Sequence, residues 1–203
     1  MNCYEQWSIF INVLIAIGTI SAVIVALFGN RIQNKIFRPK LSVVVLDGKG
    51  DLTKFTNGSR VIYYHLRFIN EKKSVTIKNC KVYLKKILKR GADNNYHNVP
   101  LPVPTKFCWA GRSDKNETVD IVTEQVLDFG FIIENDIEFK PVVEPIFNNF
   151  KGFLKQGESI RYQLEIIADN YRPKGLITIE TSWNGNWSDN LSIMESNFII
   201  KKI

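Results

Sequence analysis

The sequence predicts an all-β domain, an antiparallel immunoglobulin-like β-sandwich, preceded by one N-terminal transmembrane α-helix. Two observations support this prediction. Residues 7–28 form an apolar run without any charged side chain. After residue 40, apolar and polar residues alternate in about eight to ten short runs separated by turn residues, a pattern typical of sandwiches. A β-barrel is the second choice, because the same alternation suits a closed sheet.

The apolar run Trp7–Phe28 is long enough to cross a membrane. Its 22 residues would rise about 33 Å as a helix, and a hydrocarbon core measures about 30 Å. No Lys or Arg precedes the run and no cleavage site of small residues follows it, so we expect an uncleaved signal anchor. We assign residues 1–6 to an N-terminal tail and residues 7–29 to the span.

A basic linker, residues 30–40, follows the predicted span. Its four cations have no counterpart before the span, which predicts that the C-terminal domain is cytoplasmic and the N-terminus outside. We expect the four side chains to contact lipid headgroups; they are Arg31, Lys35, Arg38 and Lys40. Pro39 ends any helix that continues from the span. The β-domain is therefore expected over residues 41–203 of this single-pass protein of the cell membrane.

Small residues recur along one side of the predicted span. Gly18, Ala22 and Ala26 are four residues apart and would share one helix face. Such a face lets two helices approach closely, so self-association of the span is one prediction. The alternative is that small residues are simply frequent in membrane helices.

The alternation in residues 41–203 assigns side chains to an inner or an outer face. We expect an outer row at Lys81, Lys85 and Lys89. The expected inner residues are Ile62, Tyr64, Leu66, Phe68, Cys80, Val82, Leu84, Leu88, Leu127, Phe129, Phe131 and Ile133. Asn184-Gly185 predicts a two-residue hairpin, and residues 191–201 a last strand. No helical period is visible after residue 40.

The stretch Tyr63–Leu84 has the form Tyr-x-Leu-x-apolar-x-Asn followed by Asn-Cys-x-Val-x-Leu. This form resembles paired strands of immunoglobulin-like domains in uncharacterised prokaryotic single-pass membrane proteins. Those proteins also have an N-terminal membrane helix and a basic junction similar to Arg38-Pro39-Lys40. The resemblance implies a fold and a topology, and it transfers no catalytic residues.

The charge and the cysteines narrow the classes of function. The net charge is +7, of which the first 40 residues contribute +3. The remainder is too mildly basic to predict a nucleic-acid partner. Three cysteines form no disulfide framework and suit a reducing compartment.

The sequence predicts no catalytic site, cofactor or metal. His65, His97, Cys80 and Cys108 lack the spacing of zinc ligands, and no glycine-rich phosphate loop is present. Cys80 is expected to be a buried thiol. An enzyme would need a cleft that unites His97, Cys108 and a carboxylate.

Two tryptophans flank the predicted hairpin. Trp187 and Asn186 are candidate ligand contacts, because an exposed ring beside an amide can stack on a sugar or hold a peptide. The competing interpretation, which we favour, places Trp183 in the core and Trp187 over one end of the domain.

The function expected from these features is a membrane-anchored, non-enzymatic binding or scaffold module at the cytoplasmic membrane surface. Its expected partners are the bilayer and a protein, or a second copy through the span. One alternative is a sensor-effector whose transmembrane helices cluster and perturb the membrane. Another is an extracytoplasmic domain that binds carbohydrate or peptide, which requires the opposite orientation.

Overall fold

The computed structural model describes the backbone of residues 3–36, 38–46, 48–111, 118–136 and 138–203. Within these ranges it describes all side chains except those of residues 3–5 and 30–36. The chain divides into two compact units, Met1–Arg38 and Pro39–Ile203. The first unit consists of one helix, and the second contains the strands.

Helix α1 runs from Cys3 to Ile36. Its segment Gln6–Gly29 is long and apolar enough to cross a membrane, and none of that segment is buried against protein. Such a surface is the one expected of a helix whose apolar side chains face lipid. The headgroup contacts predicted for Arg31 and Lys35 involve side chains outside the described part of the chain; both residues belong to α1.

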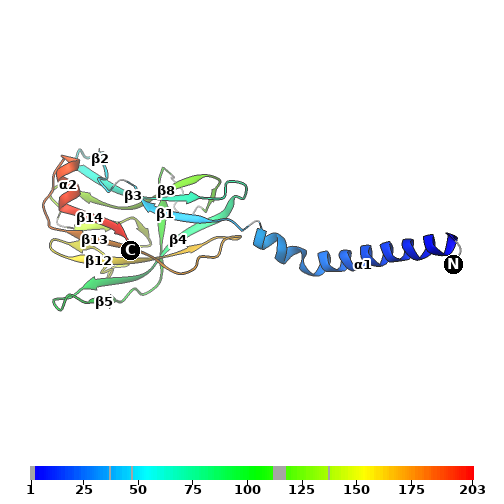
Figure 1. The fold of residues 1–203 in the computed structure, drawn as a ribbon. Coiled ribbons are helices and arrows are strands. Elements are labelled where there is room, and N and C mark those ends of the chain that lie inside the picture. Colours follow the sequence, from blue (N-terminus) through cyan, green and yellow to red (C-terminus); the bar gives the residue numbers. More distant parts are fainter. Residues whose placement is uncertain (1–2, 37, 47, 112–117, 137) are drawn as a thin grey trace. The chain divides into compact units, whose positions relative to one another are not determined.

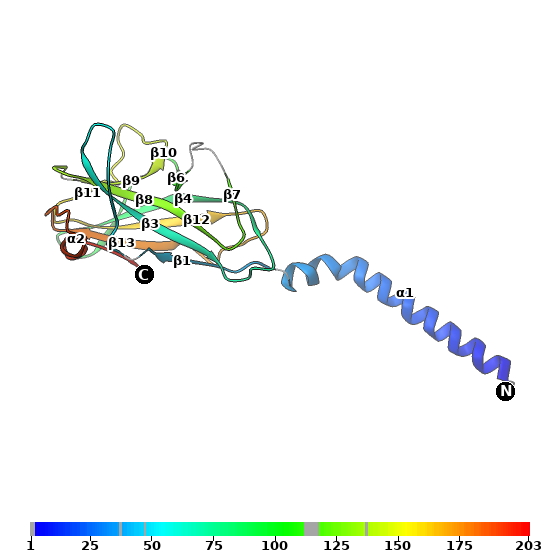
Figure 2. The same ribbon diagram turned by 90° about the horizontal axis from the view of Figure 1, so that it is seen from above.

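The second unit is built from strands and one short helix, labelled in Figures 1 and 2. Its first strands are β1 (Leu41–Val45), β2 (Asp51–Lys54), β3 (Arg60–Asn70), β4 (Ile77–Arg90), β5 (Tyr96–Val99), β6 (Thr105–Trp109) and β7 (Val119–Ile121). The later elements are β8 (Glu124–Ile133), β9 (Glu138–Pro141), β10 (Val143–Glu144), β11 (Leu154–Lys155), β12 (Ser159–Ile167), β13 (Ile177–Trp183), α2 (Leu191–Asn197) and β14 (Phe198–Lys202).

The strands form one nearly closed, barrel-like antiparallel sheet (Figures 1 and 2). Its path is β1-β3-β8-β6-β4-β12-β13-β14, and β6 joins its two halves by pairing with both β8 and β4. At the remaining opening, Lys202 Nζ donates to the carbonyl oxygen of Val43 at 3.0 Å. The all-β antiparallel prediction is confirmed. The second-choice barrel describes the sheet, whereas the immunoglobulin-like order is not confirmed.

The core lies inside this sheet and contains the residues predicted for β3. Ile62, Tyr64, Leu66 and Phe68 are each at most 1% exposed. Cys80 is also fully buried, and burial raises the pKa of its thiol to about 12. Strict alternation therefore assigns the inner face correctly where a strand is regular.

Two β-bulges overturn part of the predicted inner face. On β8, Phe129 is an extra residue between the pairs Tyr64–Gly130 and His65–Asp128. A bulge shifts the alternation by one residue. Phe131 and Ile133 are therefore only half-buried, and Ile132 is buried in their place.

The second bulge lies on β4, where Lys85 is the extra residue between the pairs Leu84–Leu164 and Lys86–Gln163. Beyond it Ile87 is buried and Leu88 is not, so the prediction for Leu88 is wrong. The predicted row of outer lysines is also interrupted. Lys89 follows Ile87 by two residues and therefore lies on the same face of β4 as Ile87. Its Nζ contacts Glu158 Oε2 at 2.9 Å.

The C-terminal segment also differs from the prediction. Residues 191–197 form helix α2, because Asn190 caps it by accepting from the backbone nitrogens of Ser192 and Ile193 at 3.0 and 3.4 Å. Asn184-Gly185 closes no two-residue hairpin. Trp183 pairs with Phe198 instead, so the connection spans residues 184–197.

Candidate binding groove

A groove of about 830 Å³ lies on the outer surface of the barrel over β4, β6, β9 and β10. It has polar residues from β4, β6 and β9 and an apolar wall from β8 and the segments after β9. The groove residues are Lys81, Tyr83, Lys106, Cys108, Phe131, Lys140, Pro141, Val142, Val143, Glu144, Pro145, Ile146 and Phe153. We call this site the lysine groove.

Strand alternation aims the polar side chains of the lysine groove outward. On β4, Lys81 and Tyr83 alternate with buried Val82 and Leu84. Tyr83 lies directly opposite Lys106 in the antiparallel pairing of β4 with β6. Residues opposite one another on adjacent strands have neighbouring side chains. The two strands therefore present their polar residues to the same groove.

The lysines differ in their partners. Lys140 Nζ donates to Asp136 Oδ2 at 2.6 Å. Within the described part of the chain, Lys81 and Lys106 form no ion pair. Glu144 lies opposite Lys106 in the pairing of β10 with β6. The groove thus has an excess of positive charge beside an apolar wall.

This wall includes exposed and half-buried hydrophobic side chains. Ile146 is 53% exposed, and Phe131 and Phe153 are half-buried. Ligand sites commonly combine apolar surface with a few oriented polar groups. The lysine groove is suited to a ligand that has both apolar and anionic groups.

An enzyme was expected to need His97, Cys108 and a carboxylate in one cleft. In the structure, the histidine that lies close to Cys108 in the strand register is His65. Cys108 pairs with Asp128 across β6 and β8, and Asp128 pairs with His65 on β3. His65 Nδ1 lies 3.0 Å from Asp128 Oδ1, and His65 Nε2 lies 3.1 Å from Asp51 Oδ2. Asp128 therefore stands between the thiol and the imidazole in the strand register.

His97 belongs to another part of the barrel. It pairs with Lys89 across β4 and β5, and its Nε2 lies 2.9 Å from Asp93 Oδ1. The β6 strand meets β4 at Tyr83 and Leu84 instead. The structure does not bring His97 and Cys108 into one cleft. Among the described residues, no group of three or more His, Cys, Asp or Glu side chains could hold a metal ion.

The predicted span contacts lie on α1. Gly18, Ala22 and Ala26 are exposed, and a Cβ added at Gly18 would meet no described atom within 4 Å. Of the four predicted headgroup cations, Arg38 and Lys40 have described side chains, and both are exposed. Lys40 Nζ lies 2.5 Å from Glu71 Oε2, and the hydrogen bond to this carboxylate raises the pKa of Lys40.

The interpretation that places Trp183 in the core is confirmed, because this side chain is 2% exposed. Trp187 is half-buried and packs against the core, whereas Asn186 is exposed. The ligand contacts proposed for Trp187 and Asn186 stay a prediction.

The lysine groove itself was not predicted from the sequence. Alternation would have placed Lys106 and Cys108 on one outer face. Nothing in the pattern, however, indicates that β6 pairs with β4, or that residues 141–146 cover the same face. Comparisons with protein-family models, with curated proteins and with solved structures found no match to this chain.

Proposed function

We propose that this protein is a membrane-anchored, non-enzymatic binding module that holds a protein partner at the cytoplasmic surface of the cell membrane. The observation on which the proposal rests is the lysine groove, in which Lys81 and Lys106 lack ion-pair partners among the described residues. The apolar segment Gln6–Gly29 supplies the anchor. The four cations that follow it support a cytoplasmic barrel.

The chemistry of the groove selects a partner segment with acidic and apolar side chains. Its carboxylates would pair with Lys81 and Lys106, and its apolar groups would cover Ile146 and Phe153. Exposed ion pairs contribute about 0–1 kcal/mol each, so most of the affinity would come from the apolar wall. The lysines would contribute selectivity and faster association.

Confinement to a membrane strengthens such a partnership. A partner that also lies at the membrane meets the groove at a raised effective concentration. A weak groove contact is then sufficient for a stable assembly. The module would therefore act on membrane proteins in preference to freely diffusing ones.

Site-specific photo-crosslinking in cells tests the proposal. A photo-reactive amino acid replaces Ile146 in the groove, and a control replaces Ile193 on α2, which is 51% exposed. We expect a discrete adduct from position 146 and none from 193. The double variant Lys81→Glu/Lys106→Glu should abolish the adduct, and Lys85→Glu/Lys86→Glu should retain it. Equal adducts from both positions, or none from either, would contradict the proposal.

The sensor-effector alternative is motivated by the exposed small-residue side of α1. Induced clustering of the full chain in vesicles would then release an entrapped dye. Exchange of Gly18 and Ala22 for Ile should reduce that release, because larger side chains separate the helices. Vesicles that stay sealed after clustering would exclude this alternative.

A further inference from the structure

We propose that one end of the barrel docks on an anionic lipid surface, an inference that rests on the proposed membrane anchor. This tether end comprises residues 39–40, 70–79, 120–123 and 168–176. Its partner is the phosphate-rich face of a bilayer that contains acidic lipids.

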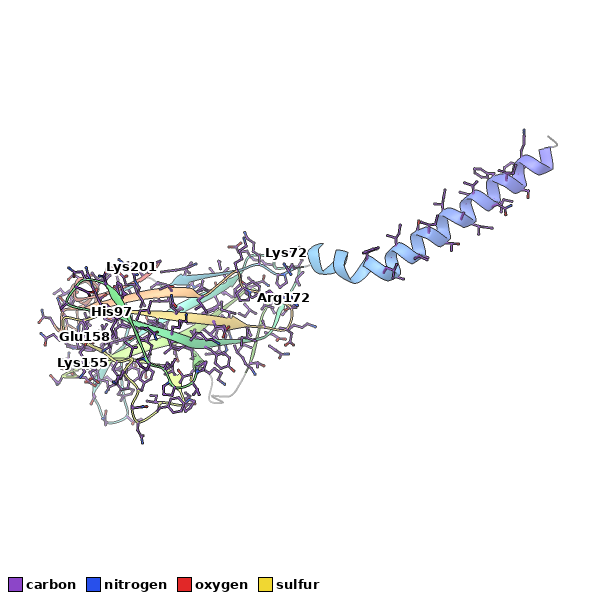
Figure 3. The ribbon with its side chains drawn as sticks, turned by 90° about the horizontal axis from the view of Figure 1, so that it is seen from below. Lys72, His97, Lys155, Glu158, Arg172 and Lys201 are labelled. Atoms are coloured by element: carbon purple, nitrogen blue, oxygen red, sulfur yellow. The ribbon has the colours of Figure 1, made fainter. Side chains whose placement is uncertain are left out.

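The tether end brings separate loops together at the start of the barrel. The backbone nitrogen of Glu71 donates to the carbonyl oxygen of Lys40 at 2.8 Å, which places the β3–β4 turn beside the first barrel residues. The β12–β13 loop joins them, because Asn170 accepts from the backbone nitrogen of Lys78 at 3.0 Å. Figure 3 shows Lys72 and Arg172 at this same end, with Lys155 and Glu158 at the other.

The loops give the tether end a strong excess of cations. The chain supplies six there, namely Lys40, Lys72, Lys73, Lys78, Arg172 and Lys174. Its three carboxylates are Glu71, Asp120 and Asp169. The six cations and three carboxylates give this small surface a net charge of +3.

The carboxylates at this end are engaged with other groups. Glu71 pairs with Lys40. Asp169 Oδ2 accepts from Asn79 Nδ2 at 2.5 Å, and Asp120 Oδ1 accepts from the Asn79 backbone nitrogen at 2.9 Å. Within the described part of the chain, four exposed cations consequently form no ion pair: Lys73, Lys78, Arg172 and Lys174.

Apolar side chains lie among these cations. Val122, in the connection from β7 to β8, is 55% exposed, and Leu176, just before β13, is 38% exposed. Cations beside short exposed apolar groups are typical of surfaces that bind at the headgroup boundary. On a bilayer, Val122 and Leu176 would enter this boundary while the neighbouring cations meet the lipid phosphates.

The length of the connecting chain also favours lipid. Helix α1 ends at Ile36 and the barrel unit begins at Pro39. Three residues extend at most about 10 Å. Charges act on an anionic leaflet over about 8–10 Å at physiological salt, and each cation there raises membrane affinity about fivefold. The tether end therefore begins within about 10 Å of chain length from the last residue of α1.

Lipid quenching in reconstituted full-length protein tests the docking. A fluorophore is attached to Val122→Cys, or to Ile193→Cys as a control, after Cys3 and Cys108 are replaced by Ser. The vesicles contain phosphatidylcholine alone or mixed with phosphatidylglycerol, with a trace of nitroxide-labelled lipid. We expect the label at position 122 to be quenched in the mixed vesicles only, and the label at 193 in neither. High salt should remove the quenching.

Two matched charge reversals identify the surface. The tether-end variant combines Lys73→Glu, Lys78→Glu, Arg172→Glu and Lys174→Glu, and it should lose the quenching. The control combines Lys54→Glu, Lys86→Glu, Arg90→Glu and Lys151→Glu, four exposed cations elsewhere on the barrel, and it should keep the quenching. Equal quenching in both vesicle types, or quenching that survives the tether-end variant, would overturn the inference.

The same samples separate this inference from the proposed anchor. Resistance of the vesicle-bound protein to alkaline carbonate reports membrane insertion of α1. Inserted protein without quenching at position 122 overturns the docking and leaves the anchor in place. Protein that carbonate extracts overturns the anchor, and with it the inference.

Discussion

The two ends of the barrel hold their loops together in different ways. At the far end, opposite the tether end, charged groups pair across elements. Arg60 Nε donates to Glu134 Oε2 at 2.8 Å, and Arg60 Nη1 donates to Asp189 Oδ2 at 2.6 Å. At the tether end, a buried neutral side chain, Asn70, joins the loops in addition to the ion pair between Lys40 and Glu71. Among the described residues of the tether end, Lys73, Lys78, Arg172 and Lys174 form no ion pair.

Asn70 is fully buried and joins three parts of the tether end. Its Nδ2 lies within hydrogen-bond distance of three carbonyl oxygens: those of Val75 at 2.8 Å, Ile121 at 3.1 Å and Val122 at 3.0 Å. Its Oδ1 accepts from the backbone nitrogen of Lys72 at 3.1 Å. One amide thus joins the β3–β4 turn to the connection between β7 and β8. Loops can therefore be held together by the hydrogen bonds of a buried amide as well as by ion pairs at the surface.

The largest expected effect is therefore the loss of Asn70. Asn70→Ala should lower the free energy of unfolding by about 2–4 kcal/mol, because buried carbonyls lose their donor. Urea denaturation of the full chain in detergent measures it. The control is Asn57→Ala in the β2–β3 turn, where an exposed Asn57 Oδ1 accepts from the backbone nitrogen of Ser59 at 3.0 Å. Equal losses for the two variants would show that the buried Asn70 stabilises the barrel no more than an exposed turn residue does.

A smaller effect is expected at the far end. Arg60→Ala should lower the melting temperature slightly at low salt and not at high salt, because Arg60 and its partners are partly exposed. Lys73→Ala, which removes no ion pair at the tether end, should leave the melting temperature unchanged at both salt concentrations. A salt-sensitive loss in Lys73→Ala would show that the charge of Lys73 stabilises the tether end and would contradict this expectation.

The smallest effect is a pH dependence at the far end. The hydrogen bonds from His97, and then from Asn95, lower the pKa of Asp93 from 3.8 to about 2. A depressed carboxyl pKa adds stability above about pH 4, and that stability is lost as the pH falls toward 2. Asp93→Asn should flatten this acid limb of a melting-temperature profile measured against pH. If the variant shows an unaltered acid limb, the pairing of Asp93 contributes nothing.

The sequence predicted the regular parts of this fold. The uncharged run before Gly29 and the alternation along β3 depend on short-range patterns, and both have the structure expected of them. Burial of Trp183 also follows from its phase with Ile179. Local periodicity is enough to predict the buried residues where one face of a regular element must be apolar.

The predictions failed where long-range pairing or a local helix cap overrode the alternation. At the bulge on β8, the pairing with β3 places Ile132 on the inner face, where alternation predicted Phe131. After β13, the Asn190 cap produced a helix where alternation indicated a strand. A cap needs only one side chain, so it is easily missed beside a hairpin signal as strong as Asn184-Gly185.

The apolar helix, the β-strand character of the barrel and the cations that follow the apolar run can each be predicted from the sequence, because each depends on neighbouring residues. Only the tertiary structure decided the closure of the sheet and the lysine groove. It also decided the gathering of Lys73, Lys78, Arg172 and Lys174 at one end. Lys73 lies in the β3–β4 turn, Lys78 at the start of β4, and Arg172 and Lys174 in the β12–β13 loop. The order in which the strands pair, rather than any spacing along the chain, places these segments together.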